Sequence, residues 1–260
     1  GVLAMQWADD GIVLSARKHG ETAAIVQLLT RDHGRHAGLV RGGVGRRMRG
    51  VLQPGNEVRA EWRARLPEHL GHYTVELTRA RAAALMDDPD RLAGLAAACA
   101  VAELTLPERE PHLASHEATR ALLDALEAGA EIWPYVYVRW ELGLLAELGF
   151  GLDLASCAVT GGSKNLTFVS PRSGRAVSDE GAGQYRDRLM KLPGFLLGNG
   201  AGGDEFNDPK AEIEAGLELT GHFLEHSALR PHDQTLPAAR TRLLERFARS
   251  TTRSGVNVGK

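Results

Sequence analysis

The sequence predicts an α+β protein, in which a small N-terminal barrel of five strands is followed by a helical domain. Two observations support this prediction. Short apolar runs separated by turn residues fill the first eighty residues, and an apolar pattern with helical period begins at Pro89. We therefore place the two domains at residues 1–82 and 83–260. With 260 residues and 43% hydrophobic side chains, the chain is long enough for each domain to bury a core.

The five strands are bounded by residues typical of turns. We predict the strands at residues 11–17, 22–30, 35–41, 57–65 and 72–79. Between them, His19-Gly20, Asp32-His33-Gly34, Gly42-Gly43 and Pro54-Gly55-Asn56 accept a positive or fixed φ at small cost. Five strands in so short a segment indicate a barrel of the oligonucleotide-binding (OB) or SH3-like type, and spacing alone does not distinguish the two.

The second domain is predicted to be all-helical apart from one insertion. Leu92, Leu95 and Cys99 recur at helical spacing, and prolines separate this helix from the next. A third helix opens at Trp133-Pro134 and ends at Gly149. The helical pattern resumes near residue 180, from 208 to 227 and from 236 to 249. Residues 250–260 are predicted to be a disordered tail.

Residues 150–178 are rich in glycine and serine and predict a compact irregular insertion. This segment contains Cys157, and the only other cysteine, Cys99, falls on an apolar helix face. So few cysteines suit a reducing compartment, and we expect a cytoplasmic protein. The longest apolar stretch, residues 92–102, is far shorter than the roughly 20 residues that cross a bilayer, so no membrane contact is expected.

Positive charge is concentrated near the N-terminus, although the formal net charge of the whole chain is -2. Nine arginines but only three acidic residues lie between Arg31 and Arg65. This asymmetry indicates contact with a nucleic acid, and its alternative is a solvated arginine-rich face. Glycines surround Arg41, Arg46, Arg47 and Arg49, which predicts a flexible loop able to fit guanidinium groups to phosphates.

The barrel contains short motifs in a specific order: Gly11-Ile12-Val13-Leu14, Gly20-Glu21-Thr22, Val40-Arg41-Gly42-Gly43 and Leu52-Gln53-Pro54. Further along the chain come Arg139-Trp140-Glu141, Leu148-Gly149-Phe150-Gly151 and Arg242-Leu243-Leu244-Glu245-Arg246-Phe247. Together these motifs span most of the chain, and the ordered set resembles the RecO family of DNA repair proteins.

The resemblance implies a recombination mediator rather than an enzyme. Members of the family bind single- and double-stranded DNA through an N-terminal OB-fold domain and anneal complementary strands. They bind the C-terminal tail of single-strand-binding protein (SSB) and, with RecR, help to load RecA onto SSB-coated DNA. Our candidate DNA-binding residues are Arg17, Lys18, Arg31, Arg35, Arg41, Arg46, Arg47 and Arg49. For the acidic SSB tail, which needs an apolar pocket rimmed by cations, the candidates are Arg120, Arg139 and Trp140.

The chain departs from the family in its insertion. Many members hold a zinc ion there with two Cys-x-x-Cys pairs, because four thiolates close a tetrahedral site. Here the first pair is reduced to Cys157-Ala158-Val159-Thr160, and the second falls near Ser178 and Gly181. One ligand of four remains. We therefore predict a zinc-ribbon-like insertion that has lost most of its metal ligands, and no bound metal or other cofactor.

Two alternatives stay open at this point. The first is an OB-fold adaptor whose basic loop binds an acidic protein instead of DNA. The second is a metal-dependent hydrolase, because His222-Phe223-Leu224-Glu225-His226 fits the inverted zincin pattern H-x-x-E-H. That pattern still needs a third protein ligand, and only two carboxylate side chains, Asp233 and Glu245, follow it in the sequence. The pattern is therefore better explained by two surface histidines on a helix.

Overall fold

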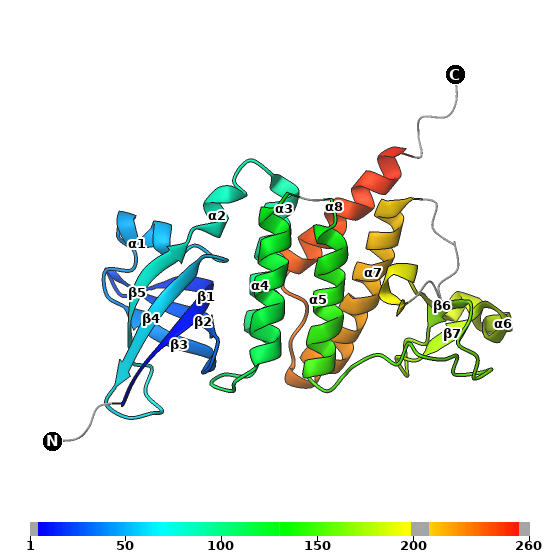
Figure 1. Ribbon diagram of the computed structural model, residues 1–260, viewed down its shortest axis with the longest axis horizontal. Helices are drawn as coiled ribbons and strands as arrows, with labels where there is room; N and C mark the ends of the chain where they lie inside the picture. The colour runs from blue at the N-terminus through cyan, green and yellow to red at the C-terminus, as the bar shows by residue number, and fades with distance from the viewer. Residues whose placement is uncertain (1–4, 130, 199–207, 255–260) are drawn as a thin grey trace. The chain divides into compact units, whose positions relative to one another are not determined.

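The computed structural model describes residues 5–129, 131–198 and 208–254 (Figure 1). Contacts between residues divide the chain into two compact units, Gly1–Ala130 and Glu131–Lys260. Within the described residues, the first unit contains the predicted strands together with four helices, and the second contains the remaining helices and the insertion. The domain boundary that we place at residues 82 and 83, where strands give way to helices, remains a prediction.

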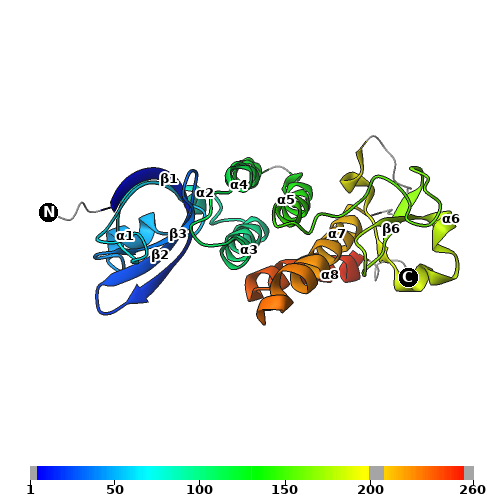
Figure 2. The ribbon, with the colours of Figure 1, turned by 90° about the horizontal axis from the view of Figure 1, so that it is seen from below.

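Five strands form the closed barrel of the first unit: β1 (Met5–His19), β2 (Ala23–Thr30), β3 (Gly34–Val40), β4 (Glu57–Ala64) and β5 (His72–Arg79). Their order around the barrel is β1-β2-β3-β5-β4. The long, curved β1 pairs antiparallel with both β2 and β4 and carries a bulge between Val13 and Ser15 (Figure 2). In contrast, β3 and β5 meet at a single parallel pair, Leu39 and His72.

The barrel core follows from the alternation of apolar side chains along the strands. It contains Val13, Val26, Leu28, Val58, Ala60, Trp62 and Tyr73, all of which are buried. The strands match the predicted ranges within one or two residues, except that β1 begins six residues early, at Met5 rather than at residue 11. The sequence does not indicate this early start, because the charged Asp9 and Asp10 lie within the strand. Asp9 is nevertheless buried, because its carboxylate accepts a hydrogen bond from the Asp32 amide and contacts His33 Nδ1.

Three helices follow β5 in the first unit: α2 (Arg81–Ala84), α3 (Pro89–Thr105) and α4 (Leu113–Glu127). The side chain of Asp88 caps α3 by accepting hydrogen bonds from the amides of Asp90 and Arg91. On its buried side, α3 turns Cys99 toward the carbonyl of Val13 in β1. Burial raises the pKa of Cys99 to about 12, which keeps the thiol protonated and agrees with its predicted place on an apolar helix face.

The second unit is built on α5 (Trp133–Glu147), α7 (Pro209–Phe223) and α8 (Ala238–Ser254). A π-helical segment, η4 (Leu224–Leu229), and a short 3₁₀ turn, η5 (Arg230–His232), follow α7. Arg240 of α8 is fully buried and donates hydrogen bonds to Glu141 of α5 and to the carbonyl of Leu217 in α7. Thr220 of α7 also donates to Glu141, so one buried polar cluster joins the three helices.

The insertion is more regular than predicted. It holds a three-stranded antiparallel sheet of order β7-β6-β8, made by β6 (Leu166–Val169), β7 (Ala176–Ser178) and β8 (Met190–Lys191). The helix predicted near residue 180 is only the four-residue α6 (Asp179–Ala182), followed by the 3₁₀ segments η1 (Gly183–Arg188) and η2 (Gly194–Leu196). All four residues of β6 are buried, which explains why its strand showed no polar alternation.

The last helix also differs from its prediction. α8 continues to Ser254, so residues 250–254, which we predicted to be part of a disordered tail, are helical. The rest of that tail lies outside the described residues. Across the described ranges, none of the helices combines the length and the apolar character that a membrane span requires.

Candidate nucleic-acid interface

A groove of about 670 Å³ runs between the β1–β2 hairpin and the segment that follows β3. Arg17 and Lys18, near the end of β1, line one side, and Arg49 lines the other. The lining also includes Ser15, Ala16, Ala24, Gly43, Val44, Leu52, Gln53 and Pro54. The structure thus brings together three of the eight predicted DNA-binding residues from positions far apart in the sequence. Ser15 and Gln53 are polar groove residues that our sequence analysis did not select.

The predicted flexible loop is instead a tight turn followed by a short helix, α1 (Arg46–Val51). The turn is ordered by hydrogen bonds from Gly43 to Val40 and from Val44 to Thr22. Gly43 also packs closely on Ala24, where an added Cβ would lie 2.6 Å from the Ala24 methyl group. The arginines of this segment are therefore presented on a folded support, which lowers the entropy lost when they bind a ligand.

The apolar residues of α1 face the barrel and its arginines face solvent. Met48 and Val51 pack against the barrel core. Arg46, Arg47 and Arg49 are exposed, as is Arg41 at the preceding turn. The structure shows no carboxylate paired with these four arginines among the residues it describes. Glu103 of α3 lies beside the groove, where it accepts a hydrogen bond from Ser15 and lies 3.5 Å from Arg17.

Two of the predicted DNA-binding arginines have other partners. Arg35 is largely buried and donates hydrogen bonds to the carbonyl of Leu106 and to Gln27. It fastens β3 to the chain after α3, so its assignment as a phosphate contact is not supported by its geometry. Arg31 is half-exposed and lies within ion-pair distance of Asp32 and Glu117. Neither residue lines the groove.

The barrel aromatics are core residues. Trp62 and Tyr73 are buried and donate hydrogen bonds to the carbonyls of Leu70 and His36. Trp7 stacks on His33 and on Trp62, with ring centroids 4.0 and 5.6 Å apart. Burial lowers the pKa of the neighbouring His36 to about 4 and keeps this ring neutral at pH 7. None of these three aromatics lines the groove, so they do not offer bases a stacking surface there.

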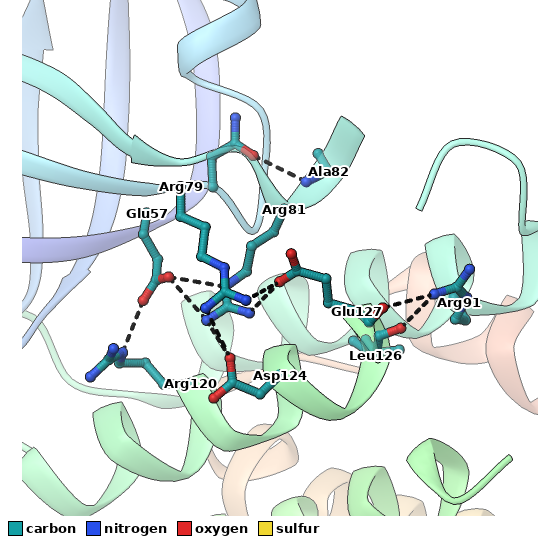
Figure 3. Close-up of polar contacts among 10 residues, drawn as sticks. Glu57, Arg79, Arg81, Ala82, Arg91, Arg120, Asp124, Leu126 and Glu127 are labelled. Carbon is teal, nitrogen blue, oxygen red and sulfur yellow. Dashed lines mark hydrogen bonds and ion pairs between the residues drawn. The ribbon is translucent and has the colours of Figure 1, made fainter. Parts of the chain in front are cut away.

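A second set of arginines in this unit forms a dense ion-pair network, which we call the Arg81 network (Figure 3). Arg81 of α2 is fully buried and lies within 3.0 Å of Glu57, Asp124 and Glu127. Arg79 pairs with the same two acids of α4. Arg120, a predicted contact for the SSB tail, donates to Glu57 at 2.9 Å and belongs to this network. Its partner gives Arg120 a structural role in the first unit.

In the second unit, Arg139 lies at the edge of a cavity of about 480 Å³. Its guanidinium is exposed and donates two hydrogen bonds to the carbonyl of Phe195. The apolar part of the lining comes from Leu142, Ala146, Leu152, Leu196 and Leu197. Trp140, the third residue predicted for the SSB tail, is 5% exposed and packs in the core instead. Arg139 is thus the one predicted tail contact that the structure places beside an apolar cavity.

The degenerate zinc position is held together by sulfur-centred hydrogen bonds. Cys157 Sγ accepts bonds from the amides of Val159, Thr160 and Ser178, at 3.2 to 3.4 Å, and from the Ser178 hydroxyl. Gly181 packs on the sulfur so closely that a Cβ would lie 2.8 Å away. The predicted ligand positions therefore do meet, but a hydroxyl pair, a glycine and one thiol do not fit a zinc ion.

The hydrogen bonds also change the acidity of Cys157. Burial opposes ionisation, but hydrogen bonds from Ser178 and Thr160 outweigh it and lower the pKa of the thiol to about 6.

The histidines of the H-x-x-E-H pattern do not form a metal site. His222 Nε2 lies 3.0 Å from the carbonyl of Pro171, and His226 Nδ1 lies 2.8 Å from the carbonyl of His222. The two rings stack on each other, with centroids 4.1 Å apart. Within the described ranges, His, Cys, Asp and Glu side chains form no group of three that could hold a metal ion. The hydrolase alternative therefore has no geometric support.

Comparison with known proteins agrees with this arrangement. Residues 5–81 match the model "Recombination protein O N terminal", and residues 86–236 match "Recombination protein O C terminal". The chain belongs to the RecO family. The DNA repair protein RecO of Rhodospirillum centenum is 56% identical to this chain over 254 residues, which cover 97% of this chain and 98% of the relative. The RecO of Rhodospirillum rubrum is 52% identical, covering 94% and 97%, and that of Cereibacter sphaeroides is 50% identical, covering 95% and 100%.

Membership of the RecO family supports a role in DNA repair and recombination. The two matching family models meet between residues 81 and 86, where the strands give way to helices.

Proposed function

We propose that this RecO-family chain is a recombination mediator that binds single- and double-stranded DNA through its barrel. The observation that carries the proposal is the groove lined by Arg17, Lys18 and Arg49, beside the exposed arginines of α1. Exposed guanidinium groups without carboxylate partners attract phosphates, and because phosphate contacts carry no sequence information, we expect little sequence preference.

The order of the strands supports an OB fold for the barrel. A closed five-stranded barrel in which β1 pairs with both β2 and β4 is the arrangement expected of that fold. An OB fold binds nucleic acid across its strands and connecting loops. The groove lies between the β1–β2 hairpin and the segment after β3, which includes such a loop.

The cavity beside Arg139 supports a contact with the SSB tail. A peptide that is acidic and ends in an apolar residue would place its side chain among Leu142, Leu196 and Leu197 and its carboxylate against Arg139. From the family we further propose that the protein anneals complementary strands, acts with RecR and helps to load RecA onto SSB-coated DNA. The proposal includes no catalytic step and no cofactor.

The decisive experiment is fluorescence anisotropy of labelled single-stranded DNA at increasing salt. We expect the triple variant Arg46→Ala, Arg47→Ala, Arg49→Ala to bind more weakly. The slope of log K against log salt should fall by about 2, because each phosphate contact contributes about 0.7 on single strands. The matched control is Arg59→Ala with Arg63→Ala, two exposed β4 arginines that pair with Asp10 and Glu61.

An apolar component of the same groove favours one other candidate function. Ala24, Val44, Leu52 and Pro54 line it beside the basic residues, as they would in a receptor for an acidic, partly apolar protein segment. If the folded wild type fails to bind DNA at low salt, this adaptor function replaces the mediator, and pull-down with acidic peptides becomes the test.

A further inference from the structure

The guanidinium of Arg139 has a defined orientation beside the apolar cavity of the second unit. Its Nε and Nη2 atoms both donate hydrogen bonds to the carbonyl of Phe195, at 3.1 and 2.6 Å. A guanidinium carries five N–H groups in a planar fork, so these two bonds fix its plane and leave three N–H groups on Nη1 and Nη2. Within the described residues, no carboxylate is paired with Arg139. The outer edge of the fork is therefore available to a carboxylate of a ligand.

Phe195, which supplies that carbonyl, is held between α5 and α7 by its ring. The ring packs edge-on against Tyr135 of α5, with centroids 4.9 Å apart and planes at 89°. On the α7 side, the missing side chain of Gly216 leaves room for the ring. A Cβ at this position would lie 3.2 Å from Phe195 Cζ and 3.0 Å from a methyl carbon of Val138. Phe195 belongs to the three-residue segment η2, and these ring contacts fasten that segment to the two helices.

We propose that Tyr135 and Gly216 are positioning residues for peptide recognition. They hold the ring of Phe195, whose carbonyl in turn orients the guanidinium of Arg139 toward the terminal carboxylate of a bound peptide. This inference rests on the function proposed above, in which the cavity receives an SSB tail. Neither Tyr135 nor Gly216 lines the cavity, so both act on the ligand through other residues. An arginine that is already oriented loses less rotamer freedom when the peptide binds, which strengthens binding.

A second glycine offers a matched control, because it lines the cavity without touching Phe195. A Cβ added at Gly143 would meet no neighbouring segment within 4 Å, so the space beside it is open. Gly143→Leu should therefore fill part of the cavity and exclude the peptide. This variant tests the cavity as the peptide site, whereas variants at Tyr135 and Gly216 test the orientation of Arg139.

The first test is a fluorescence anisotropy titration of the full-length protein with two labelled acidic peptides that end in the same apolar residue. One peptide has a free C-terminal carboxylate and the other is amidated. The wild type should bind the free acid at least about tenfold more tightly than the amide. Tyr135→Ala should reduce this ratio to about twofold, and Tyr135→Phe, which keeps the ring, should preserve it. Tyr135→Ala should add nothing to the effect of Arg139→Ala, because it acts through that arginine.

The second test reports the orientation of Arg139 without any peptide. Exchange of its Nε proton with solvent is followed by NMR of ¹⁵N-labelled protein, and the signal is assigned with Arg139→Lys. Exchange should be slow in the wild type, because this proton is hydrogen-bonded to the carbonyl of Phe195. It should become at least about fivefold faster in Tyr135→Ala and in Gly216→Ala, and it should be unchanged in Tyr135→Phe.

The two tests separate this inference from the function on which it rests. Normal binding of the free acid by Gly143→Leu would contradict the cavity as the peptide site. Unchanged Nε exchange in folded Tyr135→Ala would overturn the positioning role, whether or not the wild type binds the peptides. Equal weakening of the acid and the amide by Tyr135→Ala would also overturn it, because the ring would then support only the shape of the cavity. Thermal unfolding verifies that each variant is folded.

Discussion

The barrel groove and the Arg81 network use the same residue type for opposite purposes. Arg46, Arg47 and Arg49 are exposed on α1, and the structure describes no carboxylate paired with them. Arg81 is fully buried and is surrounded by three carboxylates. A buried charge needs partners to offset its desolvation, whereas an exposed and unpartnered charge is available to a ligand. The role of an arginine in this protein is thus decided by the carboxylates that the fold places around it.

The sharpest test of this comparison is Arg81→Met. Removing the buried guanidinium leaves Glu57, Asp124 and Glu127 close together without their shared cation. We expect a loss of about 3 to 5 kcal/mol in the free energy of unfolding. Urea denaturation followed by circular dichroism measures this loss. DNA affinity of the folded fraction should not change, and a loss below about 1 kcal/mol would contradict a structural role for the network.

Cys157 extends the comparison to a buried group whose partners are N–H donors. Cys157→Ala leaves the buried amide of Ser178 without its acceptor, and we expect a loss of about 1 to 3 kcal/mol. The effect should depend on pH. The folded thiol has a pKa of about 6, below the reference value of 9.0, so its stabilisation is complete above pH 9 and is lost as the pH falls through 6.

The measurement for Cys157 is urea denaturation of the wild type and of Cys157→Ser at pH 6 and pH 9. The wild type should gain more stability than the serine variant between these values, because serine keeps an acceptor that does not ionise. An equal gain in the two proteins would show that the thiol is not ionised in the folded state.

Arg120→Ala tests the exposed edge of the Arg81 network. Arg120 is about half-exposed, and its partner Glu57 keeps Arg81 after the substitution. We therefore expect a loss of only about 0.5 kcal/mol in the free energy of unfolding. Affinity for an SSB-tail peptide, measured by anisotropy, should be unchanged, whereas Arg139→Ala should weaken it. Weaker peptide binding by the Arg120 variant would restore it as a tail contact.

Glu103→Gln is the smallest expected change and acts on the groove. It removes the carboxylate that pairs with Arg17 while keeping an acceptor for the Ser15 hydroxyl. We expect the affinity for single-stranded DNA to rise about two- to threefold at low salt, with the gain disappearing as salt increases. Stability should stay within about 0.5 kcal/mol of the wild type. A weaker affinity would mean that Glu103 positions Arg17 for binding.

The sequence predicted the strands well because glycines, prolines and asparagines stand at their ends. It missed the start of β1, because Asp9 is polar and yet buried by bonds to residues more than twenty positions away. It also missed β6, since a strand buried on both faces shows no alternation. In both cases the missing information is long-range pairing, which local pattern does not contain.

The sequence predicted that basic residues form the candidate site, but not which of these residues line the groove. Eight basic residues were proposed for DNA, and the groove brings together Arg17, Lys18 and Arg49. Arg35 could not be set apart by sequence, because its partner, the carbonyl of Leu106, is 71 residues away. Motif alignment succeeded at the insertion, where Ser178 and Gly181 do surround Cys157.

The barrel has few hydrogen bonds between two of its neighbouring strands, β3 and β5. β3 and β5 share a single residue pair, supported by a hydrogen bond from the Leu39 amide to Gly71, whereas every other neighbouring pair of strands is joined by a long ladder. Local opening should begin there, because few hydrogen bonds must break. In such an opening, β3 and β5 separate while β1 stays paired with β2 and β4. In hydrogen exchange, we expect the Leu39 amide to exchange faster than the amides in the middle of β1.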